Sequence, residues 1–130
     1  MKILQPPGWP RPKGYANGIS VSGRIIVTGG TVGWDEHETF VSDTLPGQFE
    51  QALHNILAIL AEDGAGPGHI VRMTCYVTDI TAYRSSLREI GEAWKATIGR
   101  HYPAMALVAV SALVEPQALI EIEATAVVPE

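Results

Sequence analysis

The sequence predicts an α+β fold, a two-layer sandwich in which two helices cover one face of a mixed β-sheet. Apolar residues recur every three or four positions over 49–60 and again over 83–98, the period of an amphipathic helix. Over 70–77 and 118–127 they alternate every second residue, the period of a half-buried strand. The predicted order is β-β-α-β-α-β-β in a single domain, 1–130. Each helix joins two strands, so right-handed crossovers place both helices on the same face.

The chain begins with an extended arm and a predicted hairpin. Residues 1–14 contain four prolines, each of which fixes φ and disfavours helix at the preceding residue. The β-rich runs 19–21 and 24–28 flank Ser22-Gly23, so we expect them to pair with each other. A glycine-rich and charged loop follows over 29–38.

The first helix is predicted around the apolar stripe of 49–60, with Gln48 on its solvent side and Gly64 beyond its end. The strand 70–77 places Met73 and Cys75 on its buried face, so Cys75 is expected to be a core residue. Arg72 and Thr74 lie on the opposite face.

The second half of the chain holds one more helix and two strands. Asp79 or Thr81 can cap the helix, which ends at Gly99. Strands are predicted over 104–112 and 118–127, joined by a turn around Glu115-Pro116.

Charge and cysteine content exclude several classes of function. The chain has 9 basic and 14 acidic residues, a net charge of −5, and no basic run, which argues against a nucleic-acid surface. Its single cysteine requires no oxidising compartment. Prolines interrupt the N-terminus before any signal-peptide core or membrane span. We therefore expect a cytoplasmic protein without a membrane partner. The scattered histidines (His37, His54, His69 and His101) predict no metal site.

The second face of the sheet is predicted to be polar and uncovered. In the last strand Ile120, Ile122, Ala124 and Ala126 point at the helices, so Glu121, Glu123 and Thr125 point the other way. A sheet face this exposed is expected to be covered by self-association. Burying the carboxylates requires partners, and Arg72 is the expected partner of one of them.

Several segments together resemble the Rid/YjgF family. They are Gly14-Tyr15-Ala16-Asn17-Gly18, Ile26-Val27-Thr28-Gly29-Gly30, Gln51 to Ile56, Val71 to Asp79, Pro103-Ala104 and above all Ile120-Glu121-Ile122-Glu123-Ala124-Thr125-Ala126. The resemblance covers nearly the whole chain in order. It implies a chorismate-mutase-like fold and a homotrimer with a cleft at each subunit interface. It also implies hydrolysis of reactive imines and enamines to a carbonyl compound and ammonia, without cofactor or metal.

The resemblance assigns candidate residues to that cleft. Tyr15 matches a tyrosine that lines the cleft, and Glu121 matches the glutamate that positions the attacking water. The arginine that clamps the substrate carboxylate after Pro-Ala is replaced by Met105, next to Ala104. Methionine supplies an apolar wall and no charge, so ordinary 2-imino acids are expected to be poor substrates. Arg11 or Lys13 of the arm could bind the carboxylate instead.

The expected substrate-binding residues also include Gly30, Thr31 and Trp34. Gly30 and Thr31 stand where the family has a Ser-Gly-Gln segment, and Trp34 is either a cleft wall or a packing residue. His101 is either a solvated loop residue or a substitute for the missing arginine.

Three functions compete at this stage. The first is an imine or enamine hydrolase with an altered small-molecule substrate. The second is a non-catalytic trimer that binds a metabolite in the same cleft, in which case Glu121 is a structural carboxylate. The third is the ribonuclease activity attributed to some relatives, which the acidic charge disfavours.

Overall fold

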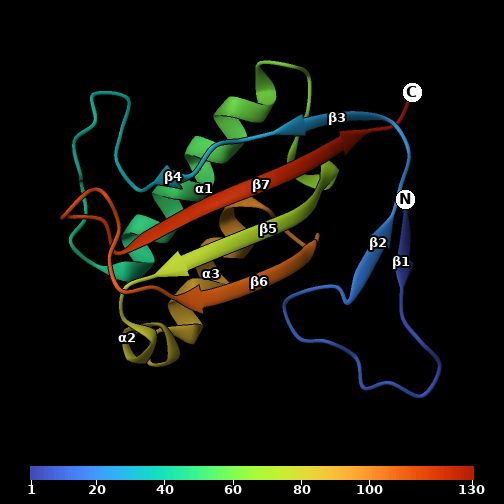
Figure 1. Cartoon of the computed structure of the whole chain (residues 1–130), viewed down its shortest axis with the longest axis horizontal. Helices are drawn as coiled ribbons and strands as arrows, with labels where there is room; N and C mark the ends of the chain where they lie inside the picture. Colours follow the sequence, from blue (N-terminus) through green and yellow to red (C-terminus); the bar gives the residue numbers. More distant parts are fainter.

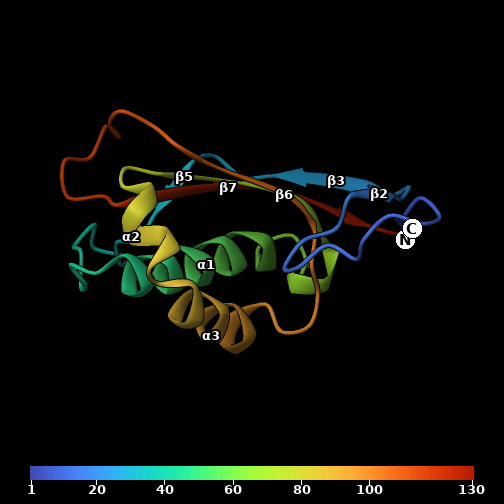
Figure 2. The same ribbon diagram turned by 90° about the horizontal axis from the view of Figure 1, so that it is seen from below.

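A computed structural model describes residues 1–130, and it arranges them in two layers. A five-stranded mixed sheet forms one layer and the helices form the other, all on one face of the sheet (Figure 2). The main helices are α1 (Leu45–Ala61) and α3 (Leu87–Thr97), with the short helices η1 (Pro67–His69) and α2 (Ile80–Arg84). The predicted two-layer α+β architecture, with its helices on one face, is confirmed.

The sheet has the order β3-β7-β5-β6, with β4 also pairing with β7 (Figure 1). Only β5 and β6 are parallel. The strands of this sheet are β3 (Arg24–Val27), β4 (Thr31–Val32), β5 (Ile70–Val77), β6 (Ala104–Ala109) and β7 (Ile120–Val128). Strand β7 begins at the end of the sheet where β6 ends (Figure 1).

The predicted hairpin between 19–21 and 24–28 is wrong. Strand β2 (Gly18–Ser20) pairs instead with β1 (Lys2–Leu4), and these two strands form a separate ribbon beside the main sheet (Figure 1). Strand β3 pairs with β7. Gly23 lies so close to the backbone of Val128 that a Cβ atom there would overlap it, and this close approach directs the chain from the ribbon onto β7.

The core lies between the sheet and α1. Leu53, Ile56 and Leu60 of α1 are fully buried against Met73 and Ile122, among others. Cys75 is buried in this core as expected, and burial raises the pKa of its thiol to about 12.

Gln48 departs from the predicted helix pattern. It is buried rather than solvent-facing, since its amide nitrogen donates to the carbonyls of Ser42 and Gln117 and its carbonyl accepts from the backbone of Leu119. One side chain thereby satisfies three backbone groups and fastens two loops to α1.

The second predicted helix is divided into α2 and α3 at Ser85-Ser86. Asp79 caps α2 by accepting from the backbone of Ala82, as predicted. The Ser85 hydroxyl donates to the Ala82 carbonyl, a local bond that competes with a continuous helix. No helix of the chain has both the length and the apolar character needed to cross a membrane.

The face of the sheet away from the helices has no covering element (Figure 2). Ile25 and Val27 of β3 are each 69% exposed there, and Val108 of β6 is also exposed. Apolar side chains on an uncovered sheet face favour association with further copies of the chain.

Candidate functional site

The first group of predicted site residues lies on the uncovered sheet face, where β7 begins. Glu121 pairs in register with Val32 of β4 and with Tyr76 of β5. Its carboxylate rests on Gly30 so closely that a Cβ atom at position 30 would overlap it. A methyl group at position 30 would therefore displace the carboxylate from this position. We call Glu121, Gly30 and Thr31 the Glu121 corner.

The edge strand beside Glu121 is interrupted, and hydrogen bonds hold the backbone at the interruption. The segment 28–30 lies between β3 and β4, both of which pair with β7. Thr28 spans this interruption, because its backbone N–H donates to the Ala124 carbonyl at 2.9 Å and its hydroxyl accepts from the Ala124 N–H at 3.1 Å. The Thr31 hydroxyl donates to the Gly29 carbonyl at 3.1 Å.

The two glutamates of β7 have different surroundings. Glu123 accepts a hydrogen bond of 2.6 Å from the Tyr76 phenol, and this bond to a carboxylate raises the pKa of Tyr76. Within the chain, the expected pairing of Arg72 with one of the glutamates is wrong: Arg72 forms no ion pair, and Tyr76, whose register partner is Glu121, donates to Glu123 instead. No ion pair or hydrogen bond of the chain engages the Glu121 carboxylate.

The second group lies on the helix side of the sheet, between β6 and α3. Tyr15 and Met105 line one pocket of about 580 Å³, and nine of its thirteen lining residues are hydrophobic. We call it the aromatic pocket. Its lining residues are Lys13, Gly14, Tyr15, Phe49, Tyr83, Leu87, Ile90, Gly91, Trp94, Lys95, Tyr102, Met105 and Leu107.

Stacked rings form part of the pocket wall. Trp94 lies between Phe49 and Tyr102, with ring centroids 6.5 Å and 6.2 Å away and interplanar angles of 24° and 9°. The Trp94 indole N–H donates to the carbonyl of His101 at 3.1 Å. The ring is therefore held by stacking and by a hydrogen bond at its polar edge.

The N-terminal arm reaches the pocket through one contact with β6. The backbone N–H of Ala16 donates to the Pro103 carbonyl at 2.9 Å, and Ala16 forms an isolated parallel bridge with Ala104. This bridge places Tyr15 and Met105 on the same pocket. Ala104 itself pairs with Arg72 and does not line the pocket.

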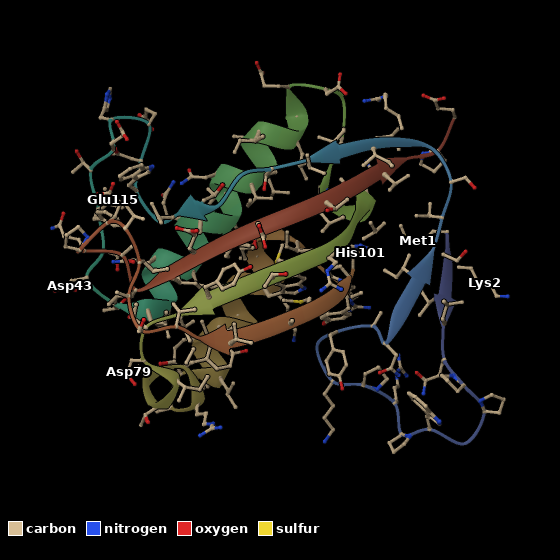
Figure 3. All side chains as sticks on the ribbon, viewed as in Figure 1. Met1, Lys2, Asp43, Asp79, His101 and Glu115 are labelled. Atoms are coloured by element: carbon tan, nitrogen blue, oxygen red, sulfur yellow. The ribbon has the colours of Figure 1, made fainter.

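His101 has neither of the two roles expected for it. Its Nε2 atom donates to the Ile70 carbonyl at 2.5 Å, and the residue is half-buried. Figure 3 shows His101 at the end of the sheet where β6 begins. It connects the starts of the parallel strands β5 and β6 and does not line the aromatic pocket.

Trp34 does not line the aromatic pocket. Its ring packs on Phe40 with a centroid distance of 5.7 Å and a tilt of 55°, and its carbonyl accepts from the Asn55 amide at 2.7 Å. These contacts are those of a packing residue. They hold the loop before α1 in place.

The two groups are far apart within one chain. Ala104 stands opposite Arg72 at the start of β5, and Glu121 stands opposite Tyr76, four residues further along the same strand. At the rise of a β-strand this is about 13 Å, with two further strand spacings across the sheet. Met105 also pairs with the buried Met73 and so faces the helices, whereas Glu121 faces away.

Several pocket residues were not anticipated from the sequence. Gly91 and Lys95 of α3 line the aromatic pocket, as does Tyr102 before β6. The sequence signal that could have identified Gly91 is a glycine inside a helix. Such a glycine weakens the helix, so its presence indicates that space is needed beside it. Of the two basic arm residues that could bind a carboxylate, Lys13 lines the pocket and Arg11 does not.

Several known proteins are similar to this chain. Residues 10–128 match the family model described as endoribonuclease L-PSP. A RutC family protein of Pyrococcus abyssi is 32% identical over 90% of this chain and 89% of its own. The 2-iminobutanoate/2-iminopropanoate deaminase of Salmonella typhimurium is 30% identical over 87% of this chain and 86% of its own. The crystal structure of YyfB, a Rid family protein of Yersinia pestis, has a TM-score of 0.86 at 29% identity and covers 98% of both chains.

Proposed function

The chain belongs to the Rid (YjgF) family, and on that premise we propose that it hydrolyses a reactive imine or enamine to a carbonyl compound and ammonia. A deaminase of 2-imino acids is among its relatives. The observation that carries the proposal is the Glu121 carboxylate, which rests on Gly30 at an uncovered sheet face with no partner in its own chain.

The reaction takes place in a cleft between two copies of the chain. Homotrimers are typical of this family. Tyr15 and Met105 of one subunit form the wall of the cleft, and the Glu121 corner of its neighbour supplies the acid–base group. The separation of these groups within one chain supports this arrangement, since only a second copy can bring them together.

Glu121 acts as the general base toward water. Its carboxylate accepts a proton as the water oxygen forms a bond to the imine carbon, and the electron pair of the C=N bond moves to nitrogen, which takes up a proton. Glu121 supplies that proton, which gives a neutral carbinolamine and restores the carboxylate. Glu121 then accepts the hydroxyl proton of the carbinolamine and delivers it to the amine nitrogen as the C–N bond breaks and the C=O bond forms. Ammonia leaves and the carbonyl compound remains. An enamine first takes a proton on carbon to become the imine.

Met105 alters which substrates react. A bidentate arginine–carboxylate contact contributes about 1.5–3 kcal/mol, or roughly 10- to 150-fold in binding, and methionine makes no such contact. Short 2-imino acids are therefore poor substrates. The favoured substrates are uncharged ones, or larger ones whose charge is bound elsewhere in the pocket.

Ammonia release from freshly generated imines tests this proposal, with substrates that carry or lack a carboxylate. Glu121→Gln keeps the shape of the side chain and removes the base, so turnover falls by about 100-fold or more. Glu123→Gln is the matched control on the same strand and face, and it retains turnover. Equal turnover by the wild type and Glu121→Gln contradicts the proposal.

A metabolite-binding trimer without catalysis is the second candidate function. The replacement of the clamping arginine by Met105 favours it, because loss of the clamp also removes a means of orienting the reacting carbon. It predicts saturable binding with no ammonia released from any substrate of the panel.

A further inference from the structure

The aromatic pocket combines an apolar floor with two free cations at its rim. Phe49, Ile90 and Trp94 are buried at its base, and Lys13 and Lys95 are exposed at its edge. Neither lysine forms an ion pair within the chain. No acidic side chain lines the pocket. A ligand with an apolar body and a negative charge at one end is complementary to such a pocket.

Gly91 provides a second and independent observation. It lies within α3 on the pocket wall, and a Cβ atom there would meet nothing within 4 Å. Glycine inside a helix is destabilising relative to alanine, yet here no close contact requires it. Its effect is to leave room in the pocket that a larger side chain would occupy.

We propose that the aromatic pocket binds the aromatic ring, or an apolar group of similar size, of an anionic substrate, with Gly91 providing the space and Lys95 and Lys13 neutralising the charge. The volume of about 580 Å³ is within the range of sites for small organic molecules. For its reaction this inference rests on the proposed function: the substrate class becomes an imine or enamine with an aromatic side chain and a carboxylate.

A lysine at the rim of the pocket binds an anion in a different way from an arginine at position 105. A lysine ammonium is a hydrated point charge on a flexible stem, so at an exposed rim it attracts an anion without fixing its orientation. The contribution of Lys95 is therefore moderate and decreases with salt. The rings and Met105 select the apolar body of the substrate.

Calorimetric binding of 3-phenylpropionate to the assembled protein tests the inference, with 3-phenylpropanamide and propionate as comparison ligands. Propionate lacks the ring and the amide lacks the charge, so each is expected to bind about 10-fold more weakly. Lys95→Gln is expected to weaken 3-phenylpropionate about 5-fold and to reduce the salt dependence of its binding. Lys2→Gln, an exposed lysine of β1 outside the pocket, is the control and changes neither.

Substitutions at Gly91 test where the ring binds. Gly91→Leu fills the space in front of α3 and is expected to weaken 3-phenylpropionate by about 10-fold or more. Gly91→Ala adds one methyl group and is expected to keep binding within about 2-fold. Equal affinity for the acid and the amide, or unchanged binding by Gly91→Leu, overturns the inference.

These measurements separate the inference from the proposed function. Tight binding of 3-phenylpropionate without ammonia release from any imine retains the inference for the pocket and contradicts the hydrolase. Turnover of small uncharged imines by a protein that binds 3-phenylpropionate no more tightly than the comparison ligands supports the hydrolase and overturns the inference for the pocket.

Discussion

The Glu121 corner and the aromatic pocket differ in almost every property that a catalytic site needs. The corner offers a carboxylate on an uncovered sheet face, beside a backbone that passes within van der Waals distance, but no enclosing wall. The pocket offers walls, rings and volume, but no acid or base apart from lysines and tyrosines. Neither region is a complete site for imine hydrolysis. Under the proposed function, the fold divides the machinery over two surfaces and association of subunits completes it.

Steric change at the corner is expected to have the largest effect. Gly30→Ala places a Cβ atom on the Glu121 carboxylate and displaces it, so turnover falls by about 10- to 100-fold. Gly29→Ala is the matched control, because a Cβ atom there meets nothing within 4 Å. Steady-state ammonia release compares the two variants. Equal losses in both would show that the close approach of Gly30 to Glu121 has no role in the reaction.

Charge in the pocket is expected to have the next largest effect. Met105→Arg introduces a guanidinium group that can bind a carboxylate with two hydrogen bonds. The kcat/KM for short 2-imino acids therefore rises about 10-fold or more relative to that for uncharged imines. Met105→Leu keeps the wall apolar and leaves that ratio unchanged. Competition between the two substrate types in one reaction measures the ratio directly. A ratio that does not change in Met105→Arg would separate position 105 from substrate choice.

The two glutamates of β7 can be compared through the titration of Tyr76. The hydrogen bond to Glu123 raises the pKa of the phenol above its usual value near 10, because ionisation would place two negative charges together. This contribution to stability is present below pH 10 and is lost as the pH rises through the raised pKa. The absorbance difference between the wild type and Tyr76→Phe follows the titration. Glu123→Gln should lower the pKa of Tyr76 more than Glu121→Gln does, and the reverse order would contradict the pairing.

The smallest expected effect concerns the stability of α3. Gly91→Ala relieves a glycine inside a helix with open space before it, so the free energy of unfolding rises by about 0.5–1 kcal/mol. Gly99→Ala is the contrasting variant, since Gly99 has φ of 84° and alanine is strained there. Denaturant unfolding measures both. A loss of stability in Gly91→Ala would show that this glycine has a role in packing.

The sequence predicted the sheet and its helices because hydrophobic periods persist through the long elements. The alternation from Ile120 to Ala126 was enough to assign Glu121 and Glu123 to the uncovered face. The hairpin prediction failed because Ser22-Gly23 is compatible with a local turn, and only the distant Val128 shows where the strand pairs.

The residues of the candidate site were predicted individually, whereas their arrangement in space was not predicted. The family resemblance identified Tyr15, Met105 and Glu121, but no local pattern indicated that the first two line a pocket on the helix side of the sheet, away from Glu121. The partner of Glu123 was missed for a similar reason. Arg72 has the complementary charge, yet the Tyr76 phenol, whose residue pairs in register with Glu121, forms the hydrogen bond to Glu123.

Co-expression of two inactive variants tests most directly whether two subunits build the site. Glu121→Gln removes the base, and Met105→Trp fills the wall of the aromatic pocket, so each variant alone should release little ammonia. In mixed trimers some interfaces pair an intact pocket from one subunit with an intact Glu121 from its neighbour. Random assortment then predicts recovery of about one quarter of wild-type turnover. Mixed trimers no more active than the separate variants would contradict a site shared between subunits.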